Sequence, residues 1–133
     1  MKRQRGFTLL EMLVASVIMA VAITGLMAGL SGATRNASRL QDYDRIVQLA
    51  RLRMNDILAD DRTQGKLGGP FPADLVGGMQ AGWNAVVQKV QEAPDPAPGN
   101  FALDRVQLEV WWVAGETRRT FNLEGYRHRI VRP

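Results

Sequence analysis

The longest apolar stretch of the chain lies near its N-terminus. Residues 7–30 form a run of 24 residues in which Glu11 is the one ionisable side chain. At about 1.5 Å per residue, a helix of this length reaches roughly 36 Å, slightly more than the ~30 Å hydrocarbon core of a bilayer. The pattern therefore predicts a membrane-spanning helix over residues 7–30.

The helical pattern continues beyond the apolar run. Between positions 40 and 57, apolar residues recur at steps of three and four with charged residues between them, which is the period of a helix packed on a core. These apolar positions are Leu40, Tyr43, Val47, Ala50, Met54 and Ile57. The small and polar residues 31–36 are expected to bend or loosen the helix. The sequence therefore predicts one helix of about 54 residues, roughly 80 Å long at ~1.5 Å per residue, ending near residue 60.

The second half of the chain alternates apolar and polar positions with the period of strands. This alternation predicts strands at 83–88, 106–113 and 121–124, with residues 126–131 as a short edge strand. The turn Ala114-Gly115-Glu116 makes 104–124 a hairpin. Loops rich in glycine and proline are expected over 65–82 and 92–100.

Neighbouring residues of a strand point to opposite faces, so Trp111 and Trp112 cannot share one core. One of the two is an exposed aromatic and a candidate anchor for a partner. The order of elements predicts an α+β fold, in which a long N-terminal transmembrane and amphipathic helix packs on a small antiparallel β-sheet.

Charge and composition narrow the picture. The chain has 133 residues, 17 basic and 13 acidic side chains and no cysteine. The absence of cysteine excludes disulfide scaffolds, iron–sulfur clusters, thiolate zinc sites and thiol catalysis. Three basic residues, Lys2, Arg3 and Arg5, precede the apolar run, and this positive charge predicts a cytoplasmic N-terminus with the body across the membrane.

Two simpler interpretations of the apolar run remain open. One is a secretory signal peptide, cut after the small-x-small pattern Ala20-Val21-Ala22, and the other is a plain single-pass anchor. Neither uses Glu11, although a charged group at membrane depth costs about 2.5 kcal/mol or more. A cut between Gly6 and Phe7 would create an α-amino group four residues before Glu11, within reach on the same helix or on a neighbouring copy. Pairing between copies would set their axial register.

Residues 2–11, Lys-Arg-Gln-Arg-Gly-Phe-Thr-Leu-Leu-Glu, resemble the class III leader of type IV pilins and type II secretion pseudopilins. The resemblance implies that an inner-membrane prepilin peptidase cuts after Gly6 and methylates the amine of Phe7, and that Glu11 and Phe7 serve assembly. It also implies a pilin-like fold divided into a basic leader (1–6), a transmembrane helix (7–30) and a periplasmic domain (31–133).

Residues 46–58, 82–90 and 104–110 are similar to the I-type minor pseudopilin of type II secretion. This resemblance implies a subunit at or near the tip of a periplasmic filament that supports protein export across the outer membrane. The implied partners are the other minor pseudopilins, the major pseudopilin, prepilin peptidase and inner-membrane lipid, with no small-molecule substrate. The H and J types, and a minor type IV pilin that acts in pilus priming, adhesion or DNA uptake, stay open as alternatives.

Binding of DNA would depend on basic side chains in the C-terminal part, although nearly all the basic excess lies at the N-terminal tip. The candidates are Arg118, Arg119, Arg127, Arg129 and Arg132. In the membrane helix, Gly25 and Gly29 form a Gly-xxx-Gly unit that could seat a neighbouring helix.

No set of residues for catalysis or for a cofactor emerges from the sequence, and we expect a protein that is not an enzyme. The sole histidine, His128, lies among arginines that repel a cation, and we expect it to be solvated or on an edge strand. Asp60, Asp61 and Asp74 are candidate calcium ligands by residue type, but their spacing matches no calcium loop and favours solvated turns.

Overall fold

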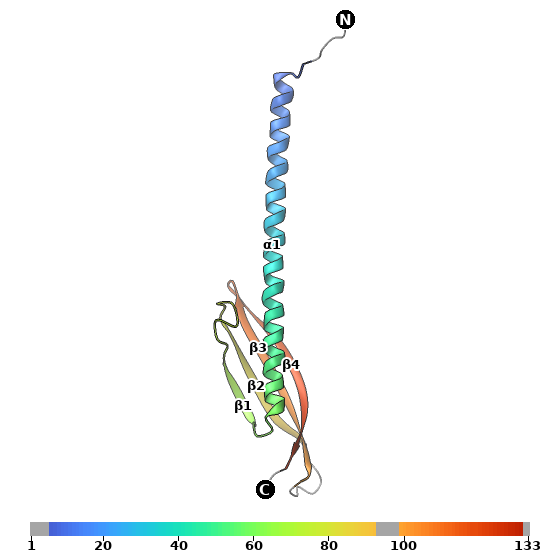
Figure 1. The fold of residues 1–133 in the computed structure, drawn as a ribbon, viewed down its shortest axis with the longest axis vertical. Coiled ribbons are helices and arrows are strands. Elements are labelled where there is room, and N and C mark those ends of the chain that lie inside the picture. The colour runs from blue at the N-terminus through green and yellow to red at the C-terminus, as the bar shows by residue number, and fades with distance from the viewer. Residues whose placement is uncertain (1–5, 93–98, 132–133) are drawn as a thin grey trace. The chain divides into compact units, whose positions relative to one another are not determined.

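The computed structural model describes residues 6–92 and 99–131. The basic leader residues 1–5, the proline-rich residues 93–98 and Arg132-Pro133, on which some of the predictions fall, lie outside the described residues. One helix precedes four strands (Figure 1): α1 (Leu9–Ala59), β1 (Gly65–Pro70), β2 (Ala81–Glu92), β3 (Phe101–Ala114) and β4 (Thr117–Ile130). The predicted α+β fold is confirmed. The chain divides into two compact units, Met1–Leu40 and Gln41–Pro133.

Helix α1 contains 51 residues, close to the predicted length. Residues 31–36 are helical throughout, so the expected loosening there is not observed. A single glycine in a helix costs only about 1 kcal/mol relative to alanine. The hydroxyl of Thr34 also donates to the carbonyl of Leu30 at 2.9 Å, so it makes no competing contact outside the helix.

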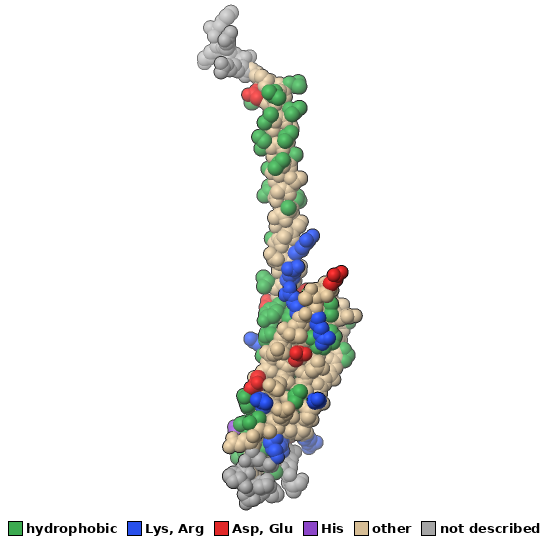
Figure 2. Space-filling model, turned by 180° about the vertical axis from the view of Figure 1, so that it is seen from behind, with side chains coloured by type: hydrophobic (Ala, Val, Ile, Leu, Met, Phe, Trp, Pro, Cys, Tyr) green, Lys and Arg blue, Asp and Glu red, His purple; other side chains and the backbone are tan. Residues whose placement is uncertain are grey.

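The N-terminal unit exposes apolar side chains. Figure 2 shows hydrophobic side chains along this part of α1, and Phe7, Leu9 and Leu26 are 85%, 88% and 72% exposed. By length and composition, α1 can cross a membrane. The prediction of a helix that is able to span a bilayer is confirmed.

The C-terminal unit contains a four-stranded antiparallel sheet in the order β1-β2-β3-β4. Strands β3 and β4 are joined by Gly115 and Glu116, as the sequence predicts, and Gly115 has φ +66°. Glycine at the first position is typical of the two-residue type II′ turn, whose twist matches that of the paired strands.

Strand β4 is longer than predicted. It runs unbroken from Thr117 to Ile130, where two short strands with a break near Gly125 were expected. Gly125 faces α1, and a Cβ atom there would lie 3.4 Å from Sδ of Met54 and 3.5 Å from a methyl group of Leu58. The glycine therefore marks a close approach of helix and sheet.

The predicted loop over 65–82 is wrong at both of its ends. Residues 65–70 form the edge strand β1 and residues 81–82 begin β2. Glycine and proline lower strand propensity, but an edge strand tolerates Pro70 because one side of it makes no ladder bonds. The remaining segment, residues 71–80, is fixed by two buried side chains, Phe71 and Val76.

The core lies between the sheet and the C-terminal part of α1, which crosses the sheet in Figure 1. Helix residues Ile46, Ala50, Met54 and Ile57 are buried. The predicted stripe is wrong at Leu40 and Tyr43, which are 66% and 42% exposed. On the sheet, the buried residues of this core are Ala81, Ala85, Val87, Val106, Leu108, Val110 and Trp112.

The two adjacent tryptophans do take opposite faces. Trp112 is 3% exposed in the core, where the ring of Tyr43 lies 6.1 Å from it. Trp111 is half-buried on the outer face of the sheet, covered by Arg118, whose guanidinium carbon lies 4.3 Å from the ring centre. The structure thus identifies Trp111 as the outward ring, partly covered rather than free.

Candidate functional site

The N-terminus of α1 is closed by Thr8 and Glu11. The backbone N–H of Thr8 donates to Oε2 of Glu11 at 2.8 Å, and the N–H of Glu11 donates to Oγ1 of Thr8 at 3.2 Å. The Thr8 hydroxyl also donates to the same carboxylate oxygen at 3.3 Å. This reciprocal arrangement is a capping box, in which two free N–H groups of the first turn are satisfied by side chains.

The capping box gives Glu11 a partner in the uncut chain. There the nitrogen of Phe7 is part of a peptide bond, so the predicted pair of the Phe7 amine and Glu11 stays a prediction for the cut chain. The spacing Thr-x-x-Glu was visible in the sequence, but the sequence interpretation considered only the charge of Glu11 and missed its capping role.

The membrane-spanning candidate segment presents an unobstructed surface at its small residues. A Cβ atom at Gly25 or at Gly29 would meet nothing within 4 Å. The hydroxyls of Ser16 and Thr24 donate to carbonyls one turn earlier, at 2.8 Å to Met12 and 3.1 Å to Ala20. The helix therefore satisfies its own hydroxyls, and helix packing at Gly25 and Gly29 stays a prediction.

A buried polar cluster in the C-terminal unit was not foreseen from the sequence. Oδ2 of Asp104, whose side chain is 0% exposed, accepts from Nε of Arg127 and Nε of Arg129, each at 3.1 Å, and from Nε2 of Gln64 at 2.7 Å. We refer to Asp104, Arg127, Arg129 and Gln64 as the Asp104 cluster. It joins β3, β4 and the segment after α1.

Within this cluster, Arg127 closes the C-terminal end of α1. Its Nη1 donates to the carbonyls of Ile57, at 2.7 Å, and of Asp60, and its Nη2 donates to the carbonyl of Thr63. The last turn of α1 has no basic residue of its own. Arg127 thus supplies, from a strand, the cation and the donors that free carbonyls at a helix C-terminus require.

The pKa of Asp104 is set by opposing effects. Burial is the largest single effect and raises the pKa, but the hydrogen bonds from Gln64, Arg127 and Arg129, with the charge of Arg129, together hold it below its ordinary value of 3.8. Asp104 is therefore a carboxylate at neutral pH, which the two arginines require as a counter-ion.

The cluster also separates the arginines that were candidates for DNA contact. Arg127 is buried and Arg129 is bound to Asp104, whereas Arg118 and Arg119 are exposed near the β3–β4 turn. Arg132 lies outside the described residues. The structure therefore does not bring these candidates together on one surface among the residues it describes.

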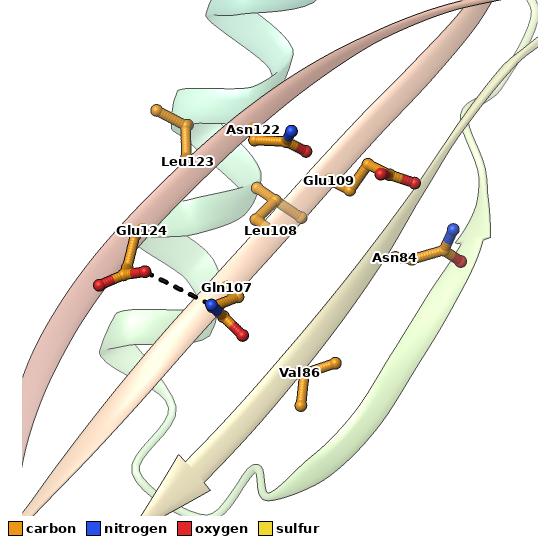
Figure 3. Close-up of a pocket in the computed structure, with 8 residues that line it drawn as sticks. All are labelled: Asn84, Val86, Gln107, Leu108, Glu109, Asn122, Leu123 and Glu124. Carbon is orange, nitrogen blue, oxygen red and sulfur yellow. Dashed lines mark hydrogen bonds between the residues drawn. The ribbon is translucent and has the colours of Figure 1, made fainter. Parts of the chain in front are cut away.

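The outer face of the sheet carries a hollow (Figure 3), lined by Asn84, Val86, Gln107, Leu108, Glu109, Asn122, Leu123 and Glu124. Gln107 donates to Glu124 at 3.4 Å, and the hydroxyl of Tyr126 donates to the same carboxylate at 2.6 Å. The hydrogen bond from Tyr126 has the larger effect on the pKa of Glu124, and it lowers this pKa together with the hydrogen bond from Gln107. The hollow offers hydrogen-bonding groups to a polar surface, and its lining includes no hydroxyl, thiol or imidazole.

The remaining candidates lie apart from one another. His128 is exposed on β4, with the ring of Phe101 6.3 Å away in an edge-on contact. The carboxylate of Asp60 accepts from the N–H of Arg62, at 3.1 Å, and from the hydroxyl of Thr63 in the turn after α1. Within residues 6–92 and 99–131, no three histidine, aspartate or glutamate side chains are grouped so that they could hold a metal ion.

Comparison with known proteins identifies the N-terminal segment. Residues 1–27 match the family described as the prokaryotic N-terminal methylation motif. This match covers the predicted leader, the predicted cleavage dipeptide, the capping box and most of the apolar run, and it confirms the resemblance seen in residues 2–11.

Two curated relatives extend the similarity into the rest of the chain. The "Type II secretion system protein I" of Pseudomonas aeruginosa is 38% identical over 73 residues, which is 50% of this chain and 57% of the relative. The protein of the same name from Xanthomonas campestris pv. campestris is 34% identical over 95 residues, 69% of this chain and 64% of the relative. The matches thus span somewhat less than two thirds of the relatives. No solved structure matches this chain. The resemblance to I-type pseudopilins is confirmed.

Proposed function

We propose that this chain is an I-type minor pseudopilin of a type II secretion system. It is made with a six-residue leader, cut by a prepilin peptidase after Gly6 and methylated on the nitrogen of Phe7. The mature subunit starts as a single-pass protein of the inner membrane, with its N-terminus in the cytoplasm and residues 31–133 in the periplasm. It then enters the pseudopilus at or near the tip and supports protein export.

One observation carries this proposal. The methylation-motif match covers residues 1–27, and in the proposed mature chain Glu11 is the fifth residue, on a helix that can cross a membrane. A carboxylate at that depth needs a partner, because an unpaired charge in lipid is costly. The uncut chain provides that partner through Thr8, which donates its N–H and its hydroxyl to Glu11.

Cleavage changes the charge around Glu11. The cut removes Lys2, Arg3 and Arg5 and creates a cationic amine on Phe7, which is 85% exposed at the start of the helix. An amine is a stronger partner for a carboxylate than a neutral N–H or hydroxyl. In an assembly of parallel helices, the Glu11 of one copy then pairs with the Phe7 amine of a neighbour and sets the axial register of the two.

The type II role is supported over a minor type IV pilin by the names of both relatives. The partners that follow are the other minor pseudopilins, the major pseudopilin, prepilin peptidase and the lipid of the inner membrane. Gly25 and Gly29 are proposed to allow a close approach of a neighbouring helix, since their surface is open.

The test separates the charge of Glu11 from its capping role. Glutamine also serves in a capping box but carries no charge. Glu11→Gln therefore keeps the start of α1 and loses only the ionic pair, whereas Glu11→Ala loses both. We expect both variants to be processed to the mature mass, and both to be depleted several-fold from cross-linked filament or tip complexes in cells.

Normal incorporation of Glu11→Gln together with depletion of Glu11→Ala would show that capping is the whole role of Glu11 and would refute the pairing. The matched control is Glu124→Gln, which makes the same glutamate-to-glutamine substitution on the exposed face of the sheet. This variant is expected to assemble normally.

A further inference from the structure

Strand β4 leaves one of its two sides open. All 14 of its residues pair with β3, and in the sheet order β1-β2-β3-β4 no described strand follows on the other side. An open edge of this length presents a row of unpaired N–H and C=O groups to any extended chain that approaches. The other edge of the sheet is weaker as a template, because β1 has six residues, of which three are glycine and one is proline.

The β3–β4 turn determines which groups of β4 face outward. A two-residue turn is flanked by a hydrogen-bonded pair, here Ala114 and Thr117, and such pairs alternate along the ladder. The backbone groups of the odd-numbered residues of β4 therefore form hydrogen bonds with β3. The same pattern continues at Val131, whose N–H donates to the carbonyl of Asn100 at 2.8 Å. The even-numbered residues from 118 to 130 direct their N–H and C=O groups to the open side.

The two faces beside this edge differ in chemistry. On the face toward α1, Phe121 and Leu123 are half-buried apolar side chains that pack against the core. Near the β3–β4 turn, Arg118 is exposed on the outer face, where it lies over Trp111, and Arg119 is exposed on the face toward α1, opposite Trp112. An added strand would therefore place apolar side chains toward α1 and gain from an acidic residue on the outer face, beside Arg118.

A second copy of this chain does not fit that requirement. Two copies could pair antiparallel through the even-numbered residues of their β4 strands. In the two registers that pair almost the whole strand, Arg119 lies opposite Arg127 or Arg129 of the other copy. Like charges directly opposite each other destabilise a strand pair. Asp104 already pairs with both Arg127 and Arg129 within one copy. Antiparallel pairing of two copies is therefore disfavoured, and a chain with a different charge pattern fits the edge better.

We propose that the open edge of β4 accepts an extended strand of another protein by β-addition. The strand carries apolar residues on the face toward α1 and an acidic residue on the outer face, next to Arg118. This surface lies wholly in the C-terminal unit and does not depend on cleavage of the leader, so its failure and the failure of the proposed function are distinguishable.

The test uses the full chain in detergent micelles and a blocked ten-residue peptide that alternates glutamate and valine. Hydrogen–deuterium exchange followed by mass spectrometry is expected to show slower exchange of β4 fragments in the presence of millimolar peptide. A peptide with lysine in place of glutamate is expected to give at least ten-fold weaker protection, because its charged residues lie on the outer face and meet Arg118 with like charge.

A matched pair of variants separates the backbone edge from the side chains. Asn122→Pro removes an outward N–H without removing a bond to β3, and it is expected to abolish the protection. Asn122→Ala keeps that N–H and is expected to retain the protection. Thermal melting of both variants checks that the fold is intact.

Any one of the following results would overturn the proposal. They are unchanged exchange of β4 at millimolar glutamate peptide, equal protection by the lysine peptide, and protection that rises with protein concentration when no peptide is present. The last result would show that a second copy occupies the edge. Slower exchange at β1 alone would place strand addition on the other edge and would contradict the assignment to β4.

Discussion

The Asp104 cluster should contribute strongly to the stability of the C-terminal unit. The side chains of Asp104 and Arg127 are 0% and 4% exposed, and both also hold other groups in place. Removing one partner of such a pair leaves the other charge buried without compensation, which costs about 3–5 kcal/mol. Since a domain is typically stable by only ~5–15 kcal/mol, this loss is a large share of the total.

We therefore expect Asp104→Asn and Arg127→Met each to lower the free energy of unfolding by at least about 3 kcal/mol at pH 7. Arg127→Met also removes donors from three carbonyls that follow the end of α1, at Ile57, Asp60 and Thr63. Glu124→Gln is the control, because its carboxylate is exposed and such contacts contribute up to about 1 kcal/mol.

The assay is urea unfolding of the C-terminal part, followed by tryptophan fluorescence, since Trp112 lies in the core.

The pH dependence of stability gives a second measurement. Because folding lowers the pKa of Asp104, the stability it contributes is complete above the unfolded pKa, near 3.8, and is lost as pH falls through the lower folded pKa. The gap between wild type and Asp104→Asn should therefore narrow in acid. Losses below about 1 kcal/mol for both variants, or a gap that does not change with pH, would refute this account.

Three further expectations concern packing and the extent of the folded unit. Gly125→Val should lower the free energy of unfolding by about 1–3 kcal/mol, because its side chain would crowd Met54, and an unchanged urea midpoint would contradict the close approach. Gly82→Ala places a methyl group 2.6 Å from the ring of Trp111, so we expect a shifted near-ultraviolet circular dichroism spectrum, and an identical spectrum would speak against this contact. A chain that begins at Arg35 should be soluble and folded with a cooperative melting transition, because the core lies in the C-terminal unit, whereas aggregation would mean that the folded unit needs the preceding residues.

Local patterns in the sequence were enough to predict α1 and the β3–β4 hairpin. A long apolar run and strict alternation across a Gly-containing turn are signals within single elements. Strand β1 escaped prediction because glycine and proline hide its pattern, and it is held by pairing with β2 rather than by its own propensity. Gly125 gave a similar false signal, since it reflects contact with α1 rather than a break in β4.

The Asp104 cluster could not be predicted, because its contacts join residues far apart in the chain. Arg127 donates to the carbonyl of Ile57 across 70 positions, and the sequence showed only a run of basic residues near the C-terminus. The capping box is the opposite case. Its Thr8 and Glu11 are three positions apart, and the signal was available but was passed over in favour of the charge of Glu11.

The most direct test of the proposed function is the mass of the N-terminal peptide of the chain isolated from its native cells. We predict a mature protein that begins with N-methylated Phe7. A chain that keeps residues 1–6 in its assembled form, or one that begins at Ile23 as a conventional signal peptide would leave it, would contradict the proposal.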